Sequence, residues 1–267
     1  MALIPPPLLA EFGGNMLPIE RRNEILTKLT LDGKVIVGDL AQYYNVTEET
    51  IRRDLDKLEK DGLAKKTYGG AVRNDSLNVD LPFTVRKQTN VEGKKYIADV
   101  IGGLINDGDY ILLDSSTTAL FTIKSIAEKK NITLITNSIE ILLEIPQKSD
   151  WRIISTGGEL VRNGLSFSGR LAERVVSEYN VDLAVISCKG FDMQKGITDT
   201  RDYNAQIKKA FMLSAKKIYL AVDNTKFDKT SFVRFAEISD IDAVVTDVEP
   251  SEEWKKYLSG NNVELYY

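Results

Sequence analysis

Apolar residues in the N-terminal part of the chain recur at helical spacing in three short segments. These segments predict helices over Pro18–Leu29, over Val37–Tyr44 and from Thr47 onward. In the third helix, Ile51, Leu55 and Leu58 lie at positions i, i+4 and i+7 and so share one face. We expect that face to pack against the other two helices, which leaves the opposite face exposed.

Two short extended segments follow the third helix. Asp61 and Gly62 end the helix, because glycine accepts the left-handed conformation that commonly follows a helix C-terminus. Residues 63–68 and 71–73 predict two strands, joined by a tight turn at Gly69–Gly70. Three helices and a hairpin make a winged helix-turn-helix, whose third helix enters the DNA major groove. We assign this domain to residues 17–73.

The remainder of the chain alternates short apolar strands with amphipathic helices. Residues 74–83 are polar and aperiodic, so we expect a linker there, followed by a helix over about 84–105. Further amphipathic stretches are Ala119–Lys129, Gly169–Tyr179 and Ala205–Ala215. The predicted strands are Tyr110–Asp114, Ile132–Thr136, Arg152–Ser155, Leu183–Ser187, Ile218–Val222, Ala243–Thr246 and Val263–Tyr267. This alternation predicts an α/β domain over residues 84–267, with a mostly parallel sheet covered on both faces.

The composition is that of an ordinary globular protein, with 43% apolar and 28% charged residues. The absence of histidine excludes imidazole metal sites and Ser-His-Asp triads, although carboxylate metal sites remain possible. We expect neither a metal nor a cofactor. The single cysteine, Cys188, excludes an intrachain disulfide, which suits a reducing cytoplasm. A net charge of −4 argues against nonspecific polyanion binding, but a specific DNA-binding protein needs only one basic face.

The first residues carry no recognisable targeting signal. Met1–Asn15 contains three consecutive prolines and lacks the basic n-region of a secretory signal. We expect residues 1–16 to be a disordered extension or an artificial addition, with Met16 as a plausible natural start. The chain has no apolar run of roughly 18 residues, the length of a membrane-spanning helix. We therefore expect a cytoplasmic protein without membrane contact.

The third predicted helix combines a core face with cationic side chains. Thr47 is placed to cap its N-terminus, and an arginine here could read guanine with two parallel hydrogen bonds. Lysines beside the turn would neutralise backbone phosphates, as would Arg73. The predicted DNA-binding residues are Thr47, Thr50, Arg52, Arg53, Lys57, Lys65, Lys66, Tyr68, Gly69 and Gly70. An alternative is that Arg52 and Arg53 are solvated charges paired with neighbouring carboxylates.

Hydroxyl-rich and polar loops follow several of the predicted strands. Asp114–Thr118 lies between a strand and a helix, where N–H donors and the helix dipole favour an anion. Four further loops have comparable positions: Thr136–Ser138, Thr156–Glu159, Ser187–Gly190 and Asp223–Lys226. Ligands of open parallel sheets bind at the carboxyl ends of the strands, so these loops predict a pocket. Each loop taken alone could equally be a helix cap or an ordinary turn.

Both halves of the sequence resemble the DeoR family of regulators. Thr47–Leu55 reads TEETIRRDL and is followed by Gly69-Gly70-Ala71, which is similar to the recognition helix and wing of that family. The segments DSSTT at 114–118, TNS at 136–138, GGEL at 157–160, KGFD at 189–192 and DNTKF at 223–227 occur in the family's order. The resemblance extends from about Glu20. Tyr68 stands where relatives often have histidine, and Lys189 where they have a small residue.

The resemblance implies a sensor domain similar to sugar-phosphate isomerases. By the same resemblance, Ser115 to Thr118 would hold a phosphate, and Lys189, Asp223 and Lys226 would contact the rest of the ligand. The expected effector-binding residues are Asp114, Ser115, Ser116, Thr117, Thr118, Asn137, Gly157, Gly158, Lys189, Asp223 and Lys226. The expected partners are a double-stranded DNA operator, a phosphorylated sugar or sugar-acid effector, and further copies of the chain in a dimer or tetramer.

The sequence is thus interpreted as a DNA-binding transcriptional regulator, a repressor of carbohydrate catabolism genes, and not as an enzyme. One alternative is a sugar-phosphate isomerase fused to a DNA-binding domain. That reaction needs a carboxylate base, and in the corresponding loop Asp192 is the carboxylate that remains. Another alternative is a scaffold whose C-terminal half only oligomerises, in which case no metabolite would stabilise it.

Overall fold

The computed structural model describes residues 16–74, 80–147 and 149–267, and the chain divides into two compact units. The division falls between residues 75 and 76, within the predicted linker at 74–83. Residues 75–79 of that linker, and residues 1–15 of the predicted extension, lie outside the described residues. In the described part, no helix is long and apolar enough to cross a bilayer.

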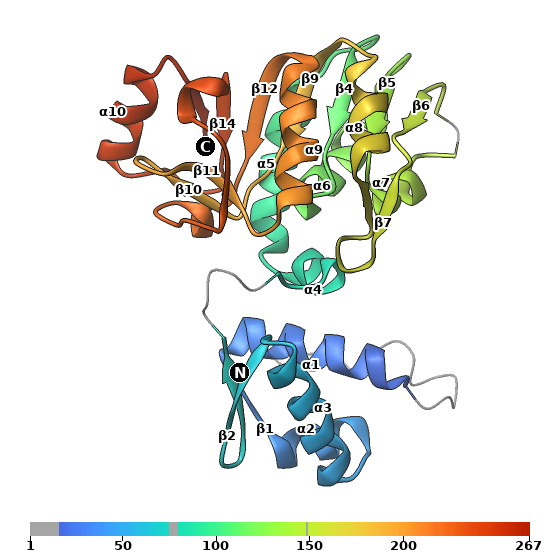
Figure 1. Cartoon of the computed structure of the whole chain (residues 1–267), viewed down its shortest axis with the longest axis vertical. Coiled ribbons are helices and arrows are strands. Elements are labelled where there is room, and N and C mark those ends of the chain that lie inside the picture. The colour runs from blue at the N-terminus through green and yellow to red at the C-terminus, as the bar shows by residue number, and fades with distance from the viewer. Residues whose placement is uncertain (1–15, 75–79, 148) are drawn as a thin grey trace. The chain divides into compact units, whose positions relative to one another are not determined.

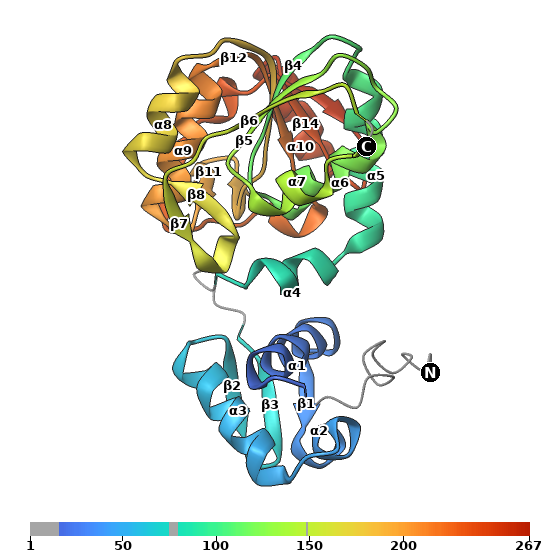
Figure 2. The same cartoon turned by 90° about the vertical axis from the view of Figure 1, so that its right-hand side faces the viewer.

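The first unit is a three-helix domain with a small antiparallel sheet. Its helices are α1 (Pro18–Asp32), α2 (Val37–Tyr44) and α3 (Glu48–Lys60), and its strands are β1 (Lys34–Ile36), β2 (Ala64–Thr67) and β3 (Gly70–Arg73). The sheet order is β1-β3-β2, and β2 lies against α3 (Figure 2). Ile25, Leu40 and Ile51 are buried where the helices meet. The three predicted helices and the hairpin are confirmed.

A buried ion pair holds α3 against α1. Arg21 Nε donates to Asp54 Oδ2 at 2.6 Å, and both side chains are less than a tenth exposed. Arg22 approaches the second oxygen of the same carboxylate at 3.4 Å. Asp54 belongs to the TIRRDL segment, and its carboxylate faces the domain interior, where the ion pair fixes α3 against α1.

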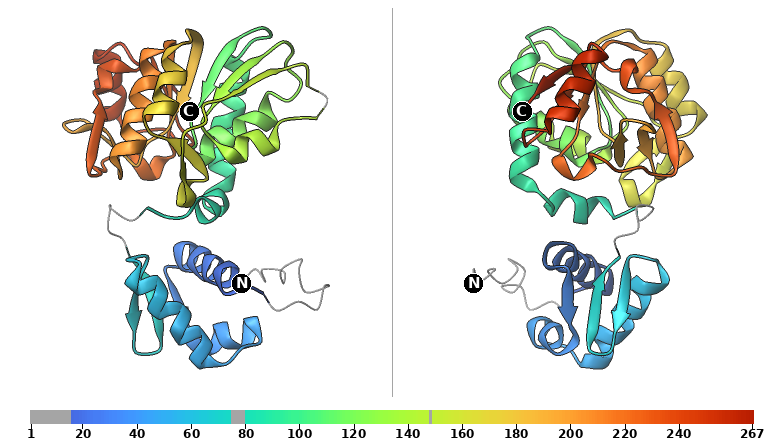
Figure 3. Two further views of the ribbon diagram at one scale, coloured as in Figure 1. Left: turned by 45° about the vertical axis from the view of Figure 1, so that its right-hand side comes forward. Right: turned by 90° about the vertical axis from the view of Figure 1, so that its left-hand side faces the viewer.

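The second unit is an α/β domain. Its helices are α4 (Phe83–Gln88), α5 (Val91–Leu104), α6 (Thr117–Ser125), α7 (Ile139–Glu144), α8 (Arg170–Ser177), α9 (Asp202–Leu213) and α10 (Glu252–Gly260). The main-sheet strands are β4 (Tyr110–Leu113), β5 (Thr133–Thr136), β6 (Arg152–Ser155), β9 (Val181–Ile186), β12 (Ala215–Ala221), β14 (Ala243–Val245) and β15 (Glu264–Tyr266). Every pair of neighbours in this sheet is parallel, in the order β15-β14-β12-β9-β4-β5-β6, with β15 and β6 at opposite edges (Figure 3). All the strands predicted within residues 84–267 therefore belong to this sheet.

Alternate residues of the central strands pack into two separate cores. In β4, Ile111 and Leu113 face one core and Leu112 faces the other, as the period of two in a strand requires. Helices α5 and α6 cover the first core, and α8 and α9 cover the second (Figure 1). The predicted α/β fold with both sheet faces covered is confirmed.

The structure differs from the sequence-based expectation where elements are short or interrupted. The helix predicted over 84–105 is two helices, because Asn90 adopts a left-handed conformation with φ of 47°. Two small antiparallel sheets were not predicted: β7 (Glu159–Val161) with β8 (Ser166–Ser168), and β10 (Gly190–Asp192) and β13 (Val233–Ala236) on either side of β11 (Gly196–Asp199). Strands of three or four residues carry too little alternation to be recognised from sequence.

Candidate functional site

Helix α3 begins with the predicted side-chain cap and exposes its cationic face. Thr47 Oγ1 accepts a hydrogen bond from the backbone N–H of Thr50 at 3.3 Å. The arginines both form exposed ion pairs one turn back along the helix: Arg52 Nη2 lies 2.5 Å from Glu48 Oε2, and Arg53 Nε lies 3.3 Å from Glu49 Oε1. Exposed pairs of this kind are weak, so both guanidinium groups can exchange their carboxylate partners for DNA at little cost.

The hairpin between β2 and β3 presents polar side chains and an aromatic tip. Lys65 is exposed, and Lys66 pairs with Asp56 of α3, while Lys57 lies 3.0 Å from Asp61. The turn itself is formed by Tyr68 and Gly69, and the Tyr68 side chain is fully exposed.

Gly70 has a different role from the one the sequence suggested. It is buried, and a Cβ atom at this position would lie 1.9 Å from the carbonyl oxygen of Val35 in β1. Glycine is therefore required for the close approach of β3 to β1, and not for an approach of this residue to DNA. Gly69, in contrast, has open space around it.

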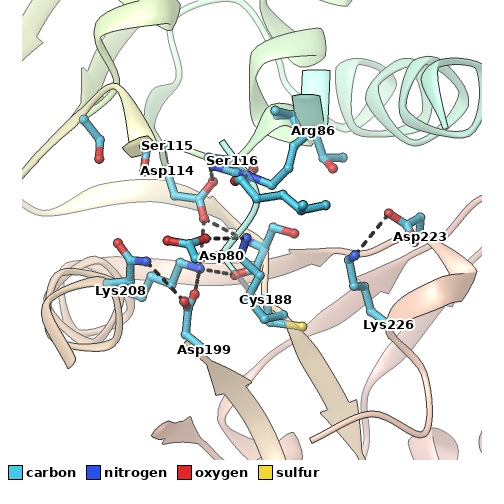
Figure 4. Close-up of a pocket in the computed structure, with 18 of the residues that line it drawn as sticks. Asp80, Arg86, Asp114, Ser115, Ser116, Cys188, Asp199, Lys208, Asp223 and Lys226 are labelled. Atoms are coloured by element: carbon cyan, nitrogen blue, oxygen red, sulfur yellow. Dashed lines mark hydrogen bonds and ion pairs between the residues drawn. The ribbon is translucent and has the colours of Figure 1, made fainter. Parts of the chain in front are cut away.

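The second unit contains a cavity of about 260 Å³ at the carboxyl ends of β4, β5, β9 and β12. This is the position at which open parallel sheets bind ligands. Nine of the eleven predicted effector-binding residues line it: Asp114, Ser115, Ser116, Thr117, Thr118, Asn137, Lys189, Asp223 and Lys226. Figure 4 shows part of this set, with Lys226 and Asp223 on one side of Cys188 and Asp114 on the other.

Gly157 and Gly158 do not line the cavity. They form the turn between β6 and β7 with φ values of 59° and 111°. A Cβ on Gly158 would lie 2.6 Å from the carbonyl oxygen of Ser168, so the glycine allows β8 to pack closely. The motif is accounted for by backbone geometry.

The conformation of the loop before α6 is fixed by hydrogen bonds of the loop itself. Asp114, which is buried, accepts from the backbone N–H of Ser116 at 2.9 Å and of Ser187 at 2.9 Å. Ser116 caps the helix by accepting from the N–H of Ala119 at 3.0 Å. Within the described residues, the backbone N–H groups of Thr117 and Thr118 have no acceptor. The first turn of α6 therefore offers two free donors at the positive end of the helix dipole.

Asn137 adds an acceptor to this part of the cavity. It is 2% exposed, and its Nδ2 donates to the carbonyl oxygen of Phe167 at 2.8 Å. Its Oδ1 is buried and has no hydrogen-bond partner among the residues that the structure describes. A buried acceptor without a donor is unfavourable, and a hydroxyl group of a ligand would satisfy it.

Two buried or partly buried cations that sequence reasoning missed also line the cavity without an ion pair to a described carboxylate. Lys94 of α5 is 5% exposed, and its ammonium donates to the backbone carbonyl of Arg86 at 2.6 Å and to that of Thr89. Arg86 of α4 donates through Nε to the carbonyl oxygen of Leu81 at 3.1 Å. Neither residue forms an ion pair with any described carboxylate, although Asp80 is close enough to Arg86 to oppose the lowering of its pKa by burial.

Two further cations of the cavity are paired. Lys208 Nζ lies 2.5 Å from Asp199 Oδ2 and 3.8 Å from Asp114 Oδ2, and it donates to the carbonyl oxygen of Ser187 at 2.7 Å. Lys189 Nζ lies 3.0 Å from Asp80 Oδ1.

A signal for the missed residues exists in the helical pattern. Lys94 stands at a core position of α5, three residues before Ile97 and seven before Ile101. Lys208 likewise lies between the buried residues Ala205 and Phe211 of α9. A lysine on the apolar face of a helix carries a buried charge, which needs a partner or a function.

The pKa of Lys94 and the pKa of Lys189 are each lowered to about 8, mainly by burial. Arg86 and Lys226 contribute to the lowering of both, while carboxylates oppose it: Asp223 and Asp247 for Lys94, Asp80 and Asp199 for Lys189. A bound anion favours the charged form of both lysines. We therefore expect the affinity for sulfate, whose own charge is constant, to fall at least about tenfold between about pH 7 and pH 9. Calorimetric titration measures this; a flat profile would show that neither lysine faces the anion.

Comparison with known proteins gives consistent results for both units. A model of the DeoR C terminal sensor domain matches residues 89–248, and a model of the DeoR-like helix-turn-helix domain matches residues 21–77. The HTH-type transcriptional regulator YulB of Bacillus subtilis is 37% identical over 87% of this chain and 90% of its own length. The transcriptional repressor AccR of Agrobacterium fabrum is 33% identical over 85% of this chain and 89% of its own.

Solved structures with similarity to the chain include a D-ribose-5-phosphate isomerase in complex with phospho-erythronic acid. Its TM-score is 0.38 at 19% sequence identity, and the match covers 51% of this chain and 54% of that one.

Proposed function

The chain belongs to the DeoR family of transcriptional regulators, and on that premise we propose that it is a repressor of carbohydrate catabolism genes. In this proposal α3 and the wing bind an operator, and the cavity of the second unit binds a phosphorylated sugar or sugar acid that changes operator affinity. We further propose that it acts in the cytoplasm as a homodimer or tetramer, since paired helix-turn-helix units engage repeated half-sites. The name of AccR supports repression.

One observation carries the effector part of the proposal. Lys94 is buried without an ion pair to any described carboxylate, and it lines the same cavity as the first turn of α6, where the N–H groups of Thr117 and Thr118 lack an acceptor among the described residues. Burying a cation without an anion is costly, so the site is built for an anion that arrives from outside. A phosphate group meets both needs, because it supplies negative charge and accepts from the N–H groups of Thr117 and Thr118.

The remaining polar groups suit a sugar. The unpaired Oδ1 of Asn137 accepts a hydrogen bond from a hydroxyl group, and Ser115, Asp223 and Lys226 supply further donors and acceptors. A cavity of about 260 Å³ has room for a small phosphorylated sugar.

Binding rather than catalysis is proposed for this site. Asp192, the carboxylate of the loop in which an isomerase would place its base, does not line the cavity. Its Oδ1 accepts from the backbone N–H groups of Gln194 at 2.9 Å and Lys195 at 2.8 Å, which closes a turn. The carboxylate of Asp199 does line the cavity, but although burial acts to raise its pKa, Lys208 and Lys189 hold it at about 2. A carboxylate that binds protons so weakly is a poor general base near neutral pH.

Thermal unfolding in a panel of phosphorylated sugars and sugar acids tests the proposal. A ligand at 100 times its dissociation constant should add about 2.7 kcal/mol to the free energy of unfolding. Thr117→Val keeps the backbone N–H and removes the hydroxyl, which in this proposal donates a further hydrogen bond to the phosphate, so it should weaken that ligand about tenfold. Thr122→Val is the matched control: Thr122 lies on the same helix and is fully buried, its hydroxyl makes no hydrogen bond to any described residue, and it does not line the cavity.

The same ligand should change operator affinity, which fluorescence anisotropy of a labelled promoter fragment measures. Release of DNA at saturating ligand is the expected sign for a repressor of catabolic genes. If no compound of the panel stabilises the protein, the C-terminal unit acts as an oligomerising scaffold and the effector proposal is wrong.

A further inference from the structure

An aspartate from the start of the second unit occupies the cavity that we assign to the effector. Asp80 directly follows residues 75–79, and its Oδ1 lies 3.0 Å from Lys189 Nζ. The side chains of Asp80 and Lys189 are 15% and 18% exposed. Figure 4 shows Asp80 within the group of side chains that includes Asp114, Asp199 and Lys208. This carboxylate belongs to none of the loops at the strand ends.

A second cation of the cavity holds the same segment. Arg86 Nε donates to the carbonyl oxygen of Leu81, the residue after Asp80, at 3.1 Å. Asp80 is also the carboxylate that most strongly opposes the lowering of the Arg86 pKa by burial. Lys189 and Arg86 thus act together on Asp80 and Leu81, although they come from elements far apart in the sequence.

We infer that Lys189 and Arg86 form an anion subsite of the effector cavity, that Asp80 occupies it as an internal competitor, and that an effector with a second anionic group displaces Asp80 from it. The inference rests on the proposed function and specifies its ligand: a phosphorylated sugar acid, with the phosphate at α6 and the carboxylate between Lys189 and Arg86.

The displacing group has to be an anion for reasons of charge. If a neutral hydroxyl replaced the Asp80 carboxylate, Lys189 and Arg86 would both remain in a largely buried site without a counter-charge. Removing one partner of a buried ion pair is strongly unfavourable, whereas exchanging one carboxylate for another preserves the pairing.

The balance of charge around the cavity fits this exchange. Among the described residues that line it, six are lysine or arginine and four are aspartate. A phosphate dianion compensates the difference while Asp80 stays in place. A ligand carboxylate that enters as Asp80 leaves then keeps the net charge of the cavity unchanged. A ligand that bears both a phosphate and a carboxylate is therefore bound without an excess of buried positive or negative charge.

Displacement of Asp80 would also give the effector a route to the DNA-binding unit. Residues 75–79 connect Asp80 covalently to that unit, which ends with the hairpin containing β3. An effector that takes the place of Asp80 binds only when Asp80 has left Lys189. It therefore has different affinities for the state with Asp80 in the subsite and the state with Asp80 displaced. Differential affinity of this kind is what coupling between two sites requires.

Titration calorimetry on the full chain with two matched probes tests the subsite. The probes are 6-phosphogluconate and glucose 6-phosphate, which differ in the carboxylate at C1. Asp80→Asn removes the internal competitor, so it should tighten 6-phosphogluconate binding about tenfold and change glucose 6-phosphate binding less than about threefold. Equal changes for both probes, or no tightening of 6-phosphogluconate, would overturn the inference.

Two controls separate this effect from others. Asp182→Asn removes a carboxylate that pairs with Lys216 at 2.8 Å outside the cavity, so it repeats the change in net charge, and we expect both affinities to stay unchanged. In the unaltered protein, amide exchange over residues 80–86 should rise with saturating 6-phosphogluconate and not with glucose 6-phosphate. Unchanged exchange with both probes would also contradict displacement.

Inorganic phosphate distinguishes failure of the subsite from failure of the proposed function. Phosphate binding that Thr117→Val weakens about tenfold supports the α6 site whatever Asp80→Asn does. Equal changes in the affinities for the two probes would then refute the subsite alone. Absence of phosphate binding would refute the α6 site, while selective tightening of 6-phosphogluconate in Asp80→Asn would still support the subsite.

Discussion

Lys208→Met should lower the free energy of unfolding by about 3–5 kcal/mol, the cost of leaving a buried charge without its partner. Lys208 neutralises Asp199, which is 1% exposed, and lies within 4 Å of Asp114, which is also 1% exposed. Methionine fills a similar volume but leaves both carboxylates uncompensated beneath the cavity. Chemical denaturation monitored by tryptophan fluorescence measures the change, with Lys216→Met as the control because its ion pair with Asp182 is largely exposed. We expect the control to unfold like the unaltered protein.

The same substitution should alter the response to acid. Because the pKa of Asp199 in the folded protein, about 2, lies below its ordinary value of 3.8, its contribution to stability is complete above that value and is lost as the pH falls toward about 2. Removing Lys208 raises the pKa of Asp199 in the folded protein. The Lys208→Met variant should therefore lose stability at a higher pH than the unaltered protein. Parallel pH profiles for the two proteins would mean that Lys208 and Asp199 do not interact in solution.

Arg53→Ala and Arg52→Ala should each weaken operator binding by about ten- to a hundredfold, the range expected when a bidentate contact to a base is lost. Both side chains lie on the exposed face of α3, and their ion pairs with Glu49 and Glu48 are easily exchanged. Lys65→Ala should weaken binding uniformly across DNA sequences and reduce the salt dependence by about one phosphate contact. Anisotropy titrations at several salt concentrations measure both effects.

The second unit supplies a closely matched control for Arg53. Arg174 of α8 pairs with Glu178 at 3.6 Å, and its side chain is 77% exposed, compared with 78% for Arg53. Arg174→Ala should leave operator affinity unchanged. Stabilisation by the effector should persist in Arg53→Ala, because the cavity lies entirely in the second unit. Loss of both properties in that variant would show that the division of function between the two units is wrong.

The fold followed from the sequence wherever one periodicity ran for several turns or strands. Leu183–Val185 of β9 and Ile111–Leu113 of β4 are apolar on both faces, which marks a buried parallel strand. The break between α4 and α5 could not be predicted, because Asn90 adopts a left-handed conformation and no glycine or proline at this position indicates a helix end. Gly70 looked like a wing-tip residue because its contact, the backbone of Val35, lies far away in the sequence.

The candidate site was predictable as far as it consists of strand-end loops. Asp114, Asn137 and Lys189 follow three different strands and meet because parallel strands end at one edge of the sheet. Lys94, Arg86 and Asp80 come from helices and the segment before them, and only the three-dimensional arrangement brings them to the same cavity.

Cys188 makes this protein convenient for site-specific labelling. It is the one cysteine of the chain, and burial raises the pKa of its thiol to about 12, so maleimides and similar electrophiles should not react with the folded protein. A cysteine introduced at the fully exposed Tyr68 would then be the sole reactive thiol. A fluorophore attached there would report contact between the hairpin tip and a DNA fragment without prior removal of the native cysteine.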